Sequence, residues 1–118
     1  RGQASSRVAL WLEEFGDQIE VIFSNNDDMA LGAIDASKAA GAGQLPLVVG
    51  VDATAPALES IAAGELYGTV LNDADGMAQA MVDLSLALWS GEDPADAVSL
   101  EDEHYVWLPY RQVTHENL

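Results

Sequence analysis

The chain has 118 residues, of which 49% are hydrophobic, and its 20 acidic and 4 basic residues give a formal net charge of −16. A chain of this length and hydrophobic content can fold around one small core, which excludes an intrinsically disordered segment. The negative charge makes a nucleic acid or an anionic membrane surface an unfavourable partner, because binding to either needs Lys and Arg side chains.

Helical periodicity and short β-branched or aromatic runs alternate along the chain, and glycines end most of the helical stretches. The predicted helices cover residues 4–15, 29–40, 54–63 and 74–90. The predicted strands cover residues 19–24, 45–51, 66–71 and 104–109. This alternation implies right-handed βαβ units, so the sequence predicts an α/β fold with a parallel sheet and helices on both faces.

Three predicted strands are followed by side chains that could bind a ligand: Asn26, Asp52 and Asn72. In an open parallel sheet, ligands bind beyond the carboxyl ends of the strands, so these side chains would share one crevice if the strands are neighbours. One carboxylate with two amides suits the hydroxyls of a neutral polyol, with Asp52 as the anchor. A phosphorylated ligand is disfavoured, because the chain has no glycine-rich phosphate loop.

The alternative role for these residues is helix capping, because Asn and Asp are favoured N-caps and a helix follows each cluster. Asp27 or Asp28 is expected to cap the helix over 29–40, which leaves Asn26 for the ligand. For Asp52 the alternative is an Asx-turn, in which the side chain bonds to nearby backbone. Both roles stay open at this point for each residue.

No catalytic arrangement is recognisable in the sequence. Cysteine is absent, and His104 and His115 are the two histidines, with neither a G-x-S-x-G nor an H-E-x-x-H motif. The adjacent carboxylates of Asp27 and Asp28 would diverge at a helix start, which argues against acid–base work. The sequence therefore predicts a binding protein and not an enzyme.

Three stretches of the chain carry a family resemblance: "VIFSNNDDMALGAIDA", "VVGVDATAPALESIAAGELYGTVLNDADGMAQAM" and "VWLPY". They resemble the C-terminal part of the bacterial galactose/glucose-binding proteins, type I periplasmic binding proteins that deliver sugar to ABC importers. The resemblance implies that Asn26, Asp52 and Asn72 hydrogen-bond the hydroxyls of D-galactose or D-glucose. The family also has a calcium site, of which Glu20 is the one residue with a match in this chain. No other cofactor is implied.

The resemblance also implies a place for each segment in a two-lobed receptor. Residues 1–72 would form part of a Rossmann-like sugar-binding lobe, residues 73–106 a crossover helix and strand that pack on the N-terminal lobe, and residues 107–118 the return. The apolar stripe of the crossover helix would lack its partner, so self-association, or exchange of this segment between copies, is expected. Because the chain starts at Arg1 without an initiator Met or signal sequence, it is expected to be an incomplete piece of a longer protein.

The resemblance implies an extracytoplasmic receptor, either periplasmic or lipid-anchored outside the cell. Its partners would be a monosaccharide, the membrane subunits of an ABC importer, and a chemoreceptor or sensor kinase. Two alternatives remain: the effector-binding domain of a LacI-type transcription repressor, and a ribose or autoinducer receptor. Repressors share an N-D-x-M-A-x-G stretch but tend to carry G-F-D-D where this chain has "GVDA", and Asn72 in "VLND" favours the hexose branch.

Overall fold

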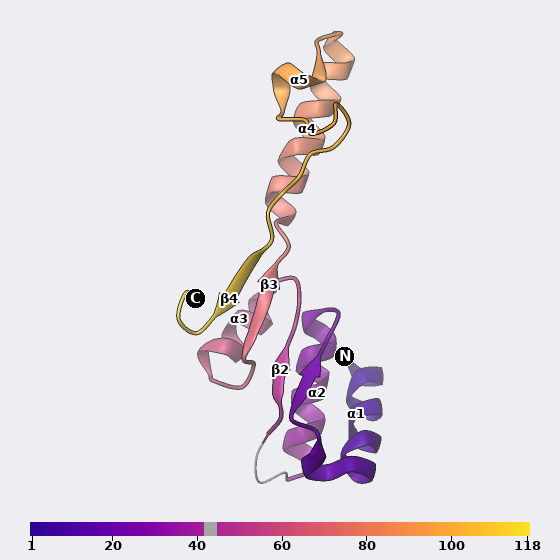
Figure 1. The fold of residues 1–118 in the computed structure, drawn as a ribbon, viewed down its shortest axis with the longest axis vertical. Helices are drawn as coiled ribbons and strands as arrows, with labels where there is room; N and C mark the ends of the chain where they lie inside the picture. The colour runs from indigo at the N-terminus through magenta and orange to yellow at the C-terminus, as the bar shows by residue number, and fades with distance from the viewer. Residues whose placement is uncertain (42–44) are drawn as a thin grey trace. The chain divides into compact units, whose positions relative to one another are not determined.

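The computed structural model describes residues 1–41 and 45–118, and Figure 1 labels its helices and strands. The chain divides into two compact units. The first, the sheet unit, comprises Arg1–Asn72 together with Arg111–Leu118. The second, the helical unit, comprises Asp73–Tyr110.

The sheet unit contains a four-stranded sheet in the order β1-β2-β3-β4. Its strands are β1 (Val21–Phe23), β2 (Leu47–Val49), β3 (Gly68–Leu71) and β4 (Arg111–Thr114). The first three strands are parallel, whereas β4 is antiparallel to β3 in a register that pairs Gly68 with Thr114. The predicted α/β class is confirmed, with a sheet that is mostly parallel.

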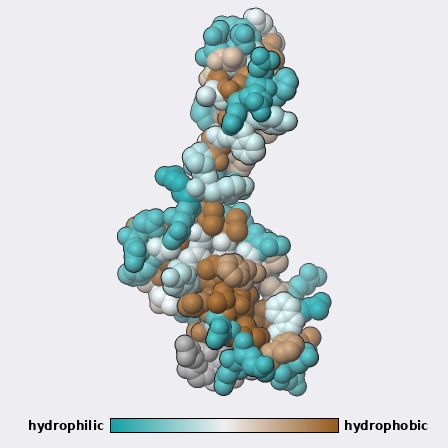
Figure 2. All heavy atoms as spheres, viewed as in Figure 1, coloured by the Kyte–Doolittle hydropathy of each residue, from teal (hydrophilic) through white to brown (hydrophobic). Residues whose placement is uncertain are grey.

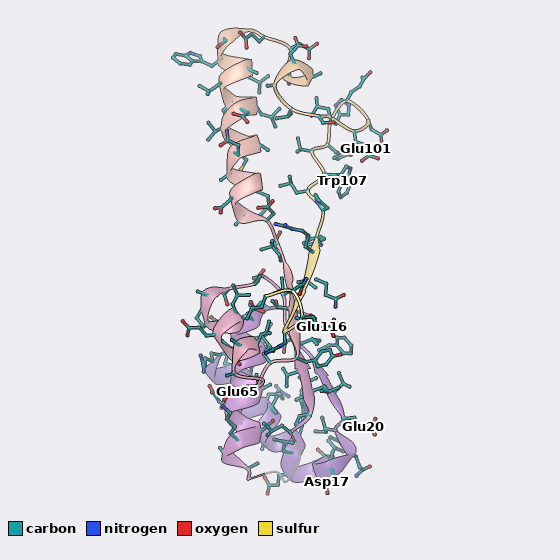
Figure 3. The ribbon with its side chains drawn as sticks, turned by 90° about the vertical axis from the view of Figure 1, so that its left-hand side faces the viewer. Asp17, Glu20, Glu65, Glu101, Trp107 and Glu116 are labelled. Carbon is teal, nitrogen blue, oxygen red and sulfur yellow. The ribbon has the colours of Figure 1, made fainter. Side chains whose placement is uncertain are left out.

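The helices of the sheet unit pack on one face of this sheet. They are α1 (Gly2–Phe15), α2 (Asp27–Ala39) and α3 (Ala55–Ala62), and a short 3-10 helix, η1 (Gly16–Gln18), follows α1. Ile22 of β1 and Val48 of β2 belong to the buried core that these helices form with the sheet. Figure 3 shows the helices on one side of the unit and the strands on the other.

The other face of the sheet is not covered by a helix in the described part of the chain. Val21, Phe23 and Leu47 alternate with the core residues of β1 and β2 and are 44%, 83% and 50% exposed. Figure 2 shows this surface as a brown area over these two strands. The expectation of helices on both faces is thus corrected. With the strand order β1-β2-β3, two right-handed crossovers in succession place α2 and α3 on the same side.

The prediction of a fourth strand over residues 104–109 is wrong. In this segment, Tyr105 makes an isolated β-bridge with Glu101, and the fourth strand of the sheet comes later, at β4. The aromatic and β-branched composition of the segment suits a strand, but Pro109 has no N–H to donate to a ladder. The residues after this proline pair with β3 instead, and they do so in the antiparallel direction.

The helical unit contains α4 (Ala74–Ser90) and α5 (Pro94–Ala97). The carboxylate of Asp73 caps α4 by accepting a hydrogen bond from the Gly76 N–H at 3.0 Å. At its other end, α4 stops at Gly91, whose φ of 74° is in the left-handed region that glycine adopts readily. The predicted span of this helix, residues 74–90, is therefore confirmed.

Large apolar side chains of α4 are exposed. They are Met77, Met81, Val82, Leu86, Leu88 and Trp89. The predicted crossover segment, residues 73–106, falls within the helical unit, and its packing on another lobe stays a prediction. Across the described residues, no helix combines the length and the hydrophobicity that a membrane span requires.

Candidate ligand-binding site

The segments that follow β1, β2 and β3 meet at one edge of the sheet. The backbone N–H of Asp27 donates to the Val51 carbonyl at 2.8 Å, and that of Asp52 donates to the Val70 carbonyl at 2.8 Å. The end of β1 is therefore tied to the segment that carries Asp52, and this segment is tied to the end of β3. The three strands are neighbours in the sheet. This arrangement is the one that Asn26, Asp52 and Asn72 need if they are to share one site.

Asn26 is the N-cap of α2. Its Oδ1 accepts a hydrogen bond from the Met29 N–H at 2.9 Å, and its backbone is extended, with φ −154° and ψ 168°. The expectation that Asp27 or Asp28 caps this helix is therefore wrong, because α2 begins two residues earlier than predicted. Capping uses the carbonyl oxygen of the Asn26 side chain and leaves its two N–H donors for another partner.

Asp52 has an unusual backbone conformation. Its φ is 115° and that of Ala53 is 55°, values that non-glycine residues rarely adopt and that cost about 1–3 kcal/mol each. An Asx-turn at Asp52 would bond its carboxylate to the Thr54 N–H, but that N–H donates to Asp27 instead. The carboxylate of Asp52, on a half-buried residue, is thus not used for the alternative Asx-turn.

Asn72 directly follows β3 and is the last residue of this segment of the sheet unit. It is half-buried. The cap of the following helix is provided by Asp73, so that the side chain of Asn72 is not needed for capping. Asn72 therefore remains a candidate for contact with a ligand.

Asp27 has a role that the sequence interpretation missed. Its carboxylate is fully buried and accepts hydrogen bonds from the Thr54 N–H at 2.7 Å, the Thr54 hydroxyl at 3.2 Å and the Thr69 hydroxyl at 2.6 Å. In the sequence, Asp27 looks like one more capping residue. The signal that could have indicated its burial is Gly50, whose lack of a side chain leaves room for this carboxylate.

The residue matched to the family's calcium site lies away from this edge. Glu20 is exposed and precedes β1, which places it at the opposite end of that strand from Asn26 (Figure 3). Among the residues that the structure describes, no group of three or more His, Asp or Glu side chains could hold a metal. A calcium role for Glu20 needs the acidic loop that the resemblance places outside this chain, so it stays a prediction.

Two cavities of the sheet unit lie elsewhere. One of about 1030 Å³ is lined by Glu20, Leu45 and Leu47, among others, at the amino ends of β1 and β2. A second, of about 260 Å³, is lined by residues of α1 and β1, among them Trp11 and Phe15. Asn26, Asp52 and Asn72 line neither cavity, so their assignment depends on their position after the strand ends.

Comparison with known proteins identifies the family. The model of the periplasmic binding protein domain matches residues 1–93. The chain is 44% identical over 117 residues to the D-galactose/methyl-galactoside binding periplasmic protein MglB of Haemophilus influenzae, covering 98% of this chain and 35% of that protein. It is 36% identical over 93 residues to a xylitol-binding protein of Mycolicibacterium smegmatis, covering 79% of this chain and 26% of that protein.

Solved structures agree with this result. An ABC transporter solute binding protein from Bacillus halodurans with bound myo-inositol matches at a TM-score of 0.78 and 35% identity, covering 98% of this chain and 37% of that one. The chain therefore spans well under half the length of the relatives it matches. The resemblance predicted from the sequence is confirmed. The chain belongs to the periplasmic binding protein family.

Proposed function

We propose that this chain is the sugar-binding part of a solute-binding receptor that feeds an ABC importer. The observation that carries the proposal is the position of Asn26, Asp52 and Asn72 after the carboxyl ends of three neighbouring parallel strands. Ligands bind at this edge of an open parallel sheet. A carboxylate with two side-chain amides can accept and donate hydrogen bonds in fixed directions, which suits the hydroxyls of a neutral sugar.

We infer that the sugar is a hexose, D-galactose or D-glucose. Support comes from the 44% identity to a galactoside-binding protein and from Asn72 within "VLND", which resembles the hexose branch. Among the other relatives, one is named for xylitol and one contains myo-inositol, and both ligands are polyols. Asp52 would make the strongest contact in each case, because a hydroxyl donates a charge-assisted hydrogen bond to its carboxylate.

The receptor is proposed to act outside the cytoplasm, in the periplasm or anchored by lipid at the cell surface. The family and the name of the Haemophilus influenzae relative support this location. The proposed partners are the membrane subunits of an ABC importer and a chemoreceptor or sensor kinase. Membership of a family of binding proteins agrees with the prediction that the chain is not an enzyme, and it favours a receptor over a LacI-type repressor.

The proposal is tested by titrating the isotopically labelled chain with D-galactose, D-glucose, xylitol and myo-inositol while its backbone amide signals are recorded by NMR. We expect the largest shifts at residues next to Asn26, Asp52 and Asn72, with the hexoses binding most tightly. Asp52→Asn should remove most of this response, whereas the matched change Asp28→Asn, at an exposed carboxylate, should leave it intact. Shifts confined to other parts of the sheet unit would contradict the proposed site.

Calorimetry of the same sugar titration measures the affinity of the chain and so shows how much of the binding site this chain contains. Because the chain spans 35% of the MglB relative, we expect very weak heat signals or none with galactose or glucose. A micromolar or lower Kd would mean that the three residues form a sufficient site by themselves. That result would refute the view that other parts of a receptor supply the remaining contacts.

A further inference from the structure

Asp27 is the one acidic residue without exposed surface in the described part of the chain. It opens α2, and its three hydrogen-bond donors belong to Thr54, in the segment after β2, and to Thr69, in β3. A buried carboxylate is stable in a protein only when its oxygens are hydrogen-bonded, and both oxygens of Asp27 are. This side chain thus connects the three segments that carry the proposed ligand residues.

The packing around Asp27 leaves no space for a side chain at position 50. A Cβ added to Gly50 would lie 2.3 Å from Oδ1 of Asp27 and 3.2 Å from its Cα. Real Cβ atoms do not come within 2.3 Å of a non-bonded heavy atom. The Asp27 carboxylate can therefore occupy its position beside Thr69 because residue 50 is glycine. The hydrogen bond between Asp27 and Thr69 therefore depends on a specific residue, Gly50, at this edge of the sheet.

The segment after β2 has a strained backbone conformation and is bonded to this network. Asp52 and Ala53 both have positive φ, yet neither is glycine. Three successive backbone N–H groups are bonded to β3 or to Asp27: that of Asp52 to the Val70 carbonyl, that of Ala53 to the Thr69 hydroxyl at 3.3 Å, and that of Thr54 to Asp27. Strain of this kind persists where the surrounding contacts over-determine the backbone.

We propose that Asp27 is a positioning residue that holds Asp52 in its ligand-binding orientation. The buried carboxylate bonds both the Thr54 N–H and the Thr69 hydroxyl, and the segment between β2 and α3 meets these two bonds with positive φ at Asp52 and Ala53. This backbone conformation sets the direction in which the Asp52 side chain leaves the chain. The inference rests on the proposed function, because it assigns Asp27 a role in the same sugar site.

Two pairs of variants test the inference. Asp27→Asn keeps the size of the side chain but replaces one acceptor oxygen with an N–H₂ group, and Asp28→Asn is its matched control at the next, exposed position. Thr69→Val removes the hydroxyl that bonds both Asp27 and Ala53, and Thr69→Ser keeps that hydroxyl. The two Thr69 variants retain the Asp27 carboxylate. They therefore test whether its hydrogen bonds set the conformation of Asp52 even if Asp27→Asn does not fold.

Two readouts are measured for each variant. The φ angles of Asp52 and Ala53 are determined by NMR from scalar and dipolar couplings, and sugar affinity is determined from the amide titration. We expect Asp27→Asn and Thr69→Val to lose the positive φ values and to lower the affinity at least about tenfold, because a buried hydrogen-bonded group has lost a partner. Asp28→Asn and Thr69→Ser should keep the φ values and an affinity within about twofold of the original.

The inference is overturned if Asp52 and Ala53 keep positive φ in both Asp27→Asn and Thr69→Val. It is also overturned if the φ values change while sugar affinity does not, because Asp27 would then shape the loop without positioning a ligand contact. Failure of the proposed function looks different. In that case the unchanged chain shows no shifts with any of the four ligands, and the φ angles alone decide whether Asp27 sets the conformation of Asp52.

Discussion

Asn26 serves the helix and the proposed ligand with different atoms of one side chain. Its Oδ1 caps α2 through the Met29 N–H, and its N–H₂ group is not needed for this cap. Asn is suited to such a double role, because its amide has an acceptor at one end and two donors at the other. Capping and ligand binding, which were alternatives in the sequence, are compatible at this position.

Two substitutions separate these functions. Asn26→Asp keeps an N-cap oxygen and removes the donors, so we expect the free energy of unfolding to stay nearly unchanged while the sugar response in the titration falls. Asn26→Ala removes both, and we expect it to lower the free energy of unfolding by about 0.5–2 kcal/mol as well. Urea denaturation and the NMR titration measure the two effects. An Asp variant that responds to sugar like the original would show that the amide donors do not contact the ligand.

At the scale of elements, α1 and α2 pack closely enough to need a glycine. A Cβ added to Gly32 in α2 would lie 2.4 Å from the Arg1 carbonyl oxygen and 3.2 Å from the Ser5 nitrogen. The guanidinium of Arg1 also donates two hydrogen bonds to Asp35, at 2.8 and 3.0 Å. The first turn of α1 is therefore held against α2 by both close packing and an ion pair.

The Arg1–Asp35 pair makes this contact sensitive to pH. Its hydrogen bonds lower the pKa of the Asp35 carboxyl below its ordinary value and raise the pKa of Arg1. A lowered carboxyl pKa means that the contribution to stability is present at neutral pH and is lost as the pH falls through that lowered value. Both side chains are about half exposed, so the pair contributes at most about 1 kcal/mol.

Gly32→Ala should disturb the contact between α1 and α2. We expect it to lower the free energy of unfolding by about 1–3 kcal/mol, because the added methyl group overlaps backbone atoms that cannot rotate away. Gly2→Ala is the matched control, since a Cβ at Gly2 meets no atom within 4 Å. Chemical denaturation of both variants measures the difference. Equal stabilities would mean that α1 moves without loss and that its packing on α2 is not specific.

At the scale of the whole molecule, large apolar side chains remain exposed on each of the two units. Phe23 and Leu47 lie on the open face of the sheet, and Met81 and Leu88 lie on α4, where they are 69% and 67% exposed. Contiguous apolar surface of this kind marks a contact site in a soluble protein. In relatives about three times as long, other parts of the polypeptide are available to cover such surfaces.

We expect the chain to self-associate through the helical unit. Size-exclusion chromatography with light scattering should give a mass above that of one chain at high concentration, and Met81→Gln combined with Leu88→Gln should restore the monomer mass. Phe23→Gln, on the open sheet face, is the comparison variant and should leave the association in place. A single-chain mass for the unchanged protein would contradict the prediction, and loss of association in Phe23→Gln alone would move the contact to the sheet.

The sequence predicted most element boundaries to within two residues, because periodicity, glycine stops and capping residues act over a few positions. It misplaced the fourth strand. The run over residues 104–109 has the composition of a strand. The fourth strand is nevertheless β4 (Arg111–Thr114), because these residues pair with β3, which lies more than thirty residues earlier in the chain. The direction of that strand and the face that the helices cover also depend on such distant pairing.

The amino-acid sequence alone predicts the alternation of helices with strands and places Asn26, Asp52 and Asn72 within three residues of the ends of three strands. These features follow from local chemistry, since each depends on residues within a few positions. The burial of Asp27 and the positive φ of Asp52, in contrast, are seen only in the folded chain. The physical reason is distance along the chain: the hydrogen bonds around Asp27 join residues 27, 54 and 69, which only folding brings into contact.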